Sequence, residues 1–115
     1  MLQPEEVVLI NERTLTIRWN DGHASVYFAR HLRFNCPCAV CETARKHEDS
    51  AQYRELQKAS ENVQIVNFNM IGRYAIGIEF NDGHNLGMYA YDYLYRLCQC
   101  DACRNDVIRI QGPVR

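Results

Sequence analysis

Six cysteines fall into two clusters that share the spacing C-x-C-x-x-C. The first cluster contains Cys36, Cys38 and Cys41, and the second contains Cys98, Cys100 and Cys103. In extended backbone, side chains two residues apart project to the same face, and a turn or helical start brings the third cysteine to that side. Three thiolates at this spacing are ligands for a soft divalent metal, and one imidazole would complete a tetrahedral Cys3His site.

Each cluster ends a longer repeated unit. The sequence WNDGH at 19–23 reappears 61 positions later as FNDGH at 80–84, and Tyr27 recurs 62 positions later. Each copy therefore carries one histidine, His23 or His84, together with three thiols. The chain reads as a duplication of one potential metal-binding unit.

Hydrophobic alternation predicts strands that position these residues. Residues 7–10 and 14–19 read as two strands, Asp-Gly at 21–22 as a hairpin turn, 24–28 as the returning strand and 29–35 as a short helix. The second copy repeats this order, with Ile, Ile and Phe in the places of Leu, Ile and Trp. The sequence predicts an α+β fold with a mostly antiparallel sheet built from two duplicated β-β-β-α units with short helices.

The chain is expected to form a single domain over residues 1–115. Its predicted parts are copy one at about 5–41, a connecting helical segment at 42–62, copy two at about 63–103 and a tail at 104–115. In the connecting segment, Asp49 and Gln52 fit a capping box, and Tyr53, Leu56 and Ala59 form a narrow apolar stripe. A helix is therefore predicted there.

Composition narrows the expected class of protein. The net charge of −1 gives no general attraction to nucleic acid or to an anionic membrane, and no run of 18 apolar residues is present. The acidic start of the chain does not resemble a secretion signal. We therefore expect a cytoplasmic protein whose clustered thiols are reduced and serve metal or redox chemistry.

The ordered motifs resemble the gamma-butyrobetaine hydroxylase-like N-terminal domain family, which includes small stand-alone bacterial proteins once described as a domain of unknown function. The resemblance rests on residues 19–22, 32–41, 72–75 and 80–84 and covers roughly residues 4 to 103. It implies a zinc site whose ligands are Cys36, Cys38, Cys41 and His84. The hydroxylases carry a catalytic iron domain after this one, and this chain ends before such a domain could begin, so no enzymatic activity is expected.

The second motif departs from the family, whose hydroxylases lack counterparts of Cys100 and Cys103. Internal symmetry assigns His23 to Cys98, Cys100 and Cys103, as His84 is assigned to the first cluster. This second metal site is inferred from the duplication alone. The symmetry further predicts that the two hairpins pair across one sheet, each turn reaching the cysteines of the other copy.

Other interpretations of these residues stay open. The first cluster could be buried, inert thiols, the second a redox-sensitive dithiol, and both histidines simple turn residues. His47 and Asp49 match the H-x-D pattern of a non-haem iron site, with His84 as a third ligand. This enzyme interpretation is disfavoured, because the pattern lies in the most polar segment instead of on a barrel strand.

Three functions follow, in descending order. The first is a small zinc-binding structural or interaction domain with a protein partner. The second is an iron–sulfur carrier or assembly accessory, since members of the family occur fused to P-loop ATPases of the iron–sulfur carrier type. The third is a thiol redox protein using either C-x-x-C pair. Partner identity and oligomeric state do not follow from the sequence.

Overall fold

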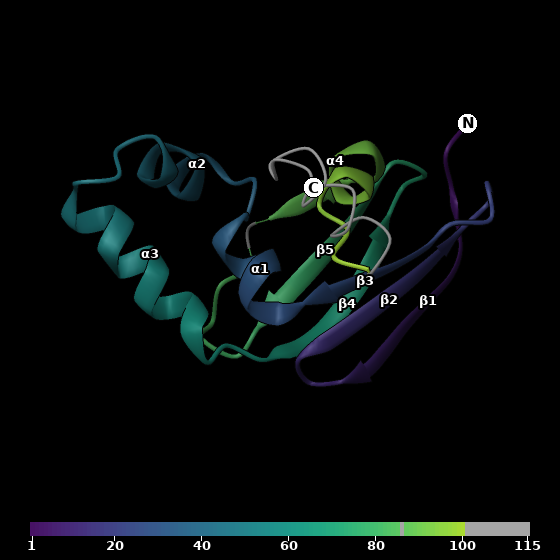
Figure 1. Cartoon of the computed structure of the whole chain (residues 1–115), viewed down its shortest axis with the longest axis horizontal. Helices are drawn as coiled ribbons and strands as arrows, with labels where there is room; N and C mark the ends of the chain where they lie inside the picture. Colours follow the sequence, from purple (N-terminus) through teal and green to yellow (C-terminus); the bar gives the residue numbers. More distant parts are fainter. Residues whose placement is uncertain (86, 101–115) are drawn as a thin grey trace, which may run out of the picture.

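The computed structural model describes residues 1–85 and 87–100. Both copies have the predicted β-β-β-α order, with two further helices between them (Figure 1). The elements are β1 (Pro4–Asn11), β2 (Thr14–Trp19), β3 (Ala24–Phe28), α1 (Ala29–Phe34), α2 (Ala39–Arg45), α3 (Ala51–Glu61), β4 (Ile65–Ile71), β5 (Ala75–Phe80), β6 (Met88–Ala90) and α4 (Tyr91–Arg96). The fold is α+β, as predicted.

The strands form two separate three-stranded antiparallel sheets, β1-β2-β3 and β4-β5-β6. The prediction that the two hairpins pair across one sheet is therefore wrong. In each copy the central strand, β2 or β5, is hydrogen-bonded on both sides by strands of its own copy. No backbone edge of β2 or β5 is left to pair with its equivalent, and the copies meet through side chains instead.

The core is built from the alternating residues that the sequence marks as apolar. Leu15, Ile17 and Trp19 on β2 and their counterparts on β5, Ile76, Ile78 and Phe80, are all at most 2% exposed. These side chains belong to one continuous core cluster that spans both copies. Burial of both sets in a shared core joins the two sheets into one unit.

Equivalent side chains of the two copies make reciprocal contacts. The buried hydroxyl of Tyr27 on β3 donates to the carbonyl of Leu94 on α4, at 2.5 Å. The hydroxyl of Tyr89 on β6 donates to the carbonyl of Leu32 on α1, at 2.6 Å. Each copy's third strand is thus tied to the helix of the other copy, so the duplication in the sequence is also a crossed duplication in space.

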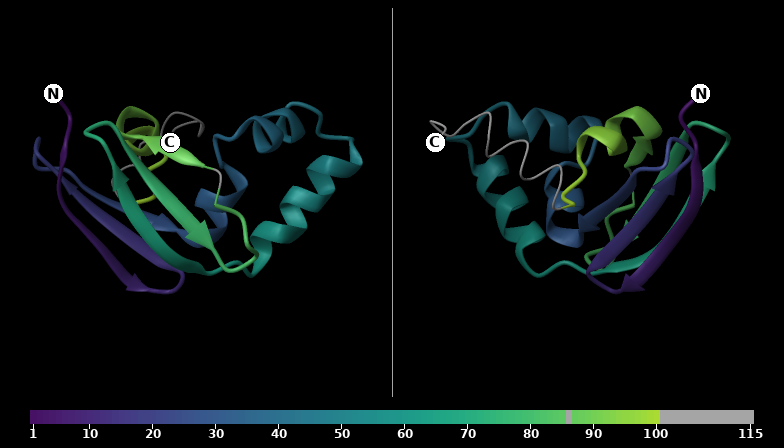
Figure 2. Two further views of the ribbon diagram at one scale, coloured as in Figure 1. Left: turned by 180° about the vertical axis from the view of Figure 1, so that it is seen from behind. Right: turned by 45° about the vertical axis from the view of Figure 1, so that its right-hand side comes forward.

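The connecting segment forms two helices where one was predicted, and they lie to one side of the sheets (Figures 1 and 2). The proposed Asp49–Gln52 capping box is wrong, because α3 is capped by Ser50, whose Oγ accepts a hydrogen bond from the Tyr53 N–H at 3.1 Å. Leu56 of the predicted stripe is buried. The cap lies one residue later than predicted, since a serine hydroxyl satisfies the free N–H as well as a carboxylate.

Two further findings bear on the predictions. Within residues 1–85 and 87–100, no helix has both the length and the apolar character needed to cross a membrane. Cys103 and the predicted tail at 104–115 lie outside the described residues.

Candidate metal centre

Both histidines are presented by tight turns. Gly83 has a φ of +87°, a conformation that glycine adopts without steric cost. The side chain of Asp82 accepts a hydrogen bond from the backbone N–H of His84 at 3.0 Å, and Asp21 accepts the equivalent bond from His23 at 2.9 Å. These aspartates are turn formers, as predicted, and they fix the direction in which each imidazole leaves its turn.

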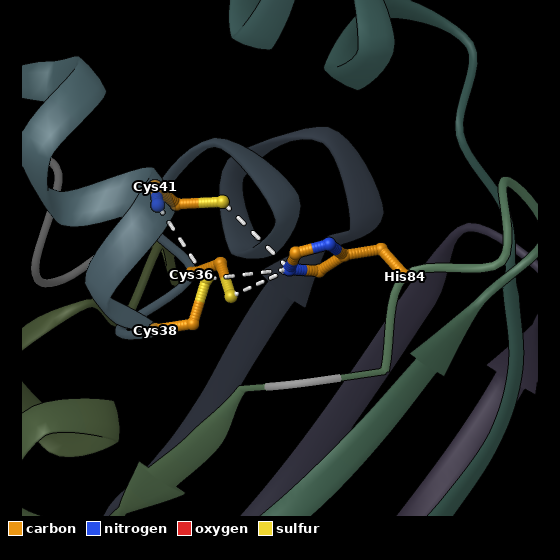
Figure 3. Close-up of side chains that lie close together, drawn as sticks. All are labelled: Cys36, Cys38, Cys41 and His84. Carbon is orange, nitrogen blue, oxygen red and sulfur yellow. Dashed lines mark hydrogen bonds between the residues drawn. The ribbon is translucent and has the colours of Figure 1, made fainter.

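The first cluster brings one imidazole against three sulfur atoms (Figure 3). The Nε2 atom of His84 lies 3.0 Å from the Sγ of Cys36, 3.6 Å from that of Cys38 and 3.7 Å from that of Cys41. All four ligand atoms lie within 4.8 Å of one another. A tetrahedral zinc site with ordinary bond lengths would place sulfur and nitrogen about 3.6 Å apart. The arrangement therefore has the dimensions of a site for one ion.

Local structure around the motif orients the thiols. Cys38 is the N-cap of α2, and its Sγ accepts the backbone N–H of Cys41 at 3.5 Å. Arg45, at the other end of α2, donates from Nη1 to the carbonyls of Phe34 and Cys36, both at 2.8 Å. The helix start and its last turn thus hold the backbone on both sides of the cluster.

The backbone of residue 87 closes the site from the second copy. A Cβ atom at Gly87 would lie 2.8 Å from the Sγ of Cys36 and 3.2 Å from Pro37. Real Cβ atoms do not approach sulfur so closely, so a larger residue here would displace either the thiol or the strand. Glycine permits the close approach of strand β6 to the first motif.

A buried arginine connects the thiols to the histidine-bearing turn. Arg33, only 7% exposed, donates from Nε to Asp82 at 3.0 Å and from Nη1 to the Sγ of Cys41 at 3.4 Å. Burial alone would lower the pKa of Arg33, but its bonds to Asp82 and Cys41 raise it, so the guanidinium stays charged. A divalent ion held by three thiolates and a neutral imidazole has a net charge of −1, which this cation would offset.

The protonation of the cluster follows from its burial. Burial raises the pKa of the Cys36 thiol to about 12 and also raises that of Cys41. Burial opposes ionisation of Cys38 too, but hydrogen bonds from the Cys41 N–H and the neighbouring thiols lower its pKa overall. Burial and the charge of Arg33 lower the pKa of His84, which keeps the imidazole neutral and able to bind a metal.

The second cluster repeats this arrangement. The Nε2 of His23 lies 3.4 Å from the Sγ of Cys98 and 3.7 Å from that of Cys100. The Sγ of Cys98 accepts the backbone N–H of Cys100 at 3.4 Å. The third predicted thiol, Cys103, lies outside the described residues. The crossed pairing derived from symmetry therefore agrees with the placement of both histidines, whereas ligation itself stays a prediction.

The H-x-D pattern is not assembled into a site. Within residues 1–85 and 87–100, groups of three or more potential ligand residues gather at the two clusters above, and neither includes His47 or Asp49. His47 lies between α2 and α3, where its side chain is exposed. Its N–H donates to the carbonyl of Ala44.

Comparison with known proteins agrees with this geometry. Residues 8–95 match the family described as gamma-butyrobetaine hydroxylase-like, N-terminal. The chain belongs to this family. The matched residues contain the whole first cluster, including His84, and end before Cys98. The second cysteine motif thus lies beyond the part of the chain by which the gamma-butyrobetaine hydroxylase-like N-terminal domain is recognised.

Several solved structures resemble this member of the family. One is a crystal structure of a protein of unknown function in the DUF971 family from Acidithiobacillus ferrooxidans. It is 34% identical with a TM-score of 0.62, and the match covers 83% of this chain and 91% of that one. A protein solved by NMR is 30% identical with a TM-score of 0.64, over 96% of this chain and 80% of its own. No curated protein matches.

Sequence reasoning missed the residues that support the ligands in this family member. Arg33, Arg45 and Gly87 belong to none of the predicted site sets. Arg33 and Asp82 are 49 residues apart in sequence, and the packing of the two copies brings them together. An arginine three positions before a metal-binding cysteine is a weak local signal, and only the fold identifies its acidic partner.

Proposed function

We propose that this chain is a zinc-binding structural or interaction domain without catalytic activity of its own. Its ion would be held by Cys36, Cys38, Cys41 and His84. The observation that carries the proposal is the position of the His84 Nε2 within 3.0–3.7 Å of three sulfurs from the other copy. Such a site stabilises a fold, because binding free energy is available only when distant segments come together.

The compactness of the cluster favours a single ion over an iron–sulfur cluster. Around one ion, all ligand atoms are edges of one small tetrahedron. In a cluster, different cysteines bind different iron atoms, so the ligand sulfurs are spread more widely. Ligand atoms that all lie within 4.8 Å of one another support the first arrangement.

A closed ligand set also supports a non-enzymatic role. Four protein ligands leave no open position on the ion for water or substrate. The family match covers the N-terminal hydroxylase-like domain alone, and His47 and Asp49 lie away from both described clusters. Reduced thiols are needed for ligation, so a cytoplasmic location is part of the proposal. The side chains of Val40, Val66 and Met88, each more than half exposed, would be available to a protein partner.

Elemental analysis of protein purified without oxygen tests the identity of the metal. Zinc gives a colourless protein, whereas an iron–sulfur cluster gives a brown one with visible absorbance. Zinc without iron would support the proposal, and iron with acid-labile sulfide would replace it with the iron–sulfur alternative.

Acid is expected to release the metal. Since burial raises the pKa of Cys36 to about 12 and also raises that of Cys41, these thiols hold protons at neutral pH unless a metal displaces them. Each displaced proton makes the apparent metal affinity fall about tenfold per pH unit as the pH decreases. Zinc titrations at several pH values measure this slope, and an affinity independent of pH would contradict thiolate ligation.

We expect no turnover of 2-oxoglutarate when ferrous iron is added. The cosubstrate requires two open positions on an iron held by a facial triad, and His47 and Asp49 form no such group with the described residues. Succinate formation is the measurement. Turnover that disappears in the His47→Ala variant would overturn the non-enzymatic assignment.

A further inference from the structure

The second cluster contains residues that are distant in sequence and close in space. His23 comes from the turn before β3, whereas Cys98 and Cys100 follow α4, 75 and 77 positions later. Their three ligand atoms lie within 4.8 Å of one another. Buried thiols that served only packing would have no reason to meet the imidazole of another hairpin. The juxtaposition is that of a ligand set.

We propose that His23, Cys98 and Cys100 form a second metal site that exchanges its ion more readily than the first. Two thiolates and an imidazole select a soft divalent ion such as zinc. The sequence offers Cys103 as a fourth ligand, although this residue lies outside the described part of the chain. The inference rests on the proposed function only in that it compares the second site with a zinc-loaded first site.

The protein positions the second set of ligands as firmly as surrounding structure allows. Asp21 accepts the His23 N–H at 2.9 Å and also accepts the hydroxyl of Tyr95, whose ring lies 5.4 Å from the imidazole. Gln99, between the two thiols, donates its N–H to Val26 at 2.8 Å and accepts the Phe28 N–H at 3.2 Å. Strand β3 thus holds the loop that carries Cys98 and Cys100 beside the histidine.

The charge around the two clusters differs at one equivalent position. Arg33 in the first copy corresponds to Tyr95 in the second, 62 positions later. Both contact the aspartate of the opposite turn, but Arg33 brings a positive charge and a bond to the Sγ of Cys41, whereas Tyr95 brings a neutral hydroxyl. A thiolate-rich ion is therefore offset by a cation at the first site only, among the described contacts.

Accessibility differs in the same direction. Cys36 is fully buried and Cys41 is 4% exposed, whereas Cys98 is 9% exposed and Cys100 is partly exposed. An attacking chelator or an acceptor protein reaches exposed thiolates more easily. Weaker charge compensation and greater exposure both favour release from the second site before the first.

Zinc release to a graded chelator series, measured on the intact chain, tests this inference. Wild-type protein is expected to hold two ions per chain and to release them in two phases. The Cys100→Ser and His23→Ala variants should each lose the readily released ion and keep the other. The Cys38→Ser variant, as the reciprocal control, should lose the tightly held ion. Two variants of the second site, from different segments, guard against a folding defect in either one.

The outcomes separate this inference from the proposed function. One ion per wild-type chain that Cys38→Ser removes would overturn the second site and leave the first intact. Two ions unaffected by Cys100→Ser and His23→Ala would also overturn it, and so would two ions released in a single phase. Metal content that no cysteine variant changes would overturn the proposed function itself.

Discussion

The Cys38→Ser variant is expected to bind zinc at the first site more than about 100-fold more weakly than the wild type, since loss of a supporting group alone weakens metal sites 10–100-fold. This corresponds to about 3 kcal/mol of lost stabilisation at a given zinc concentration. For a chain of this size, the melting temperature should fall by about 10 °C. The effect is large because Cys38 is both a predicted ligand and the N-cap of α2.

The matched control for this variant is Val40→Ser. Val40 lies between Cys38 and Cys41 in the motif, is 71% exposed and contributes no ligand atom. Calorimetry and metal analysis on both variants are the measurements. Val40→Ser should keep its metal and nearly all of its stability. If Cys38→Ser keeps full occupancy and the wild-type melting temperature, the assignment of the first site is wrong.

The Arg33→Met variant is expected to lose stability and metal affinity together. Arg33 has 9% of its side chain exposed and pairs with Asp82, whose side chain is 29% exposed. Breaking a buried pair costs 3–5 kcal/mol, and the partial exposure of Asp82 reduces our expectation to about 2 kcal/mol. The change also removes the hydrogen bond to the Sγ of Cys41 and the cation that would offset the thiolates.

The matched control is Arg18→Met, which breaks an ion pair of similar geometry at the surface. Arg18 donates to Glu6 at 2.9 Å, and both side chains are about half exposed. Exposed pairs contribute about 0–1 kcal/mol, so this variant should unfold near the wild-type temperature. Denaturant unfolding with and without zinc is the measurement. Equal losses in the two variants would show that Arg33 has no special connection to the site.

The repeat made much of the fold predictable. Apolar alternation at Leu15, Ile17 and Trp19, repeated 61 positions later, identified the central strand of each copy and its buried face. Asp-Gly turns predicted the hairpins because glycine accepts the positive φ that such turns require. Two equal units also implied an approximate twofold arrangement, from which the crossed placement of His23 and His84 followed.

The features that could not be predicted depend on long-range pairing. Nothing in the alternation of β2 and β5 distinguishes one six-stranded sheet from two three-stranded ones, because both bury the same side chains. The choice between Asp49 and Ser50 as a helix cap depends on backbone geometry within one residue. The contacts of Arg33 with Asp82 and Cys41 exist only after the two copies have packed together.

Zinc-edge X-ray absorption of the Cys100→Ser variant tests the central claim most directly, because this variant isolates the first site. The account predicts one ion bound by three sulfurs at about 2.3 Å and one imidazole nitrogen at about 2.0–2.1 Å. The additional Cys38→Ser change should remove one sulfur from this shell or abolish binding. A shell of oxygen and nitrogen alone, or no bound zinc, would contradict the assignment of Cys36, Cys38, Cys41 and His84.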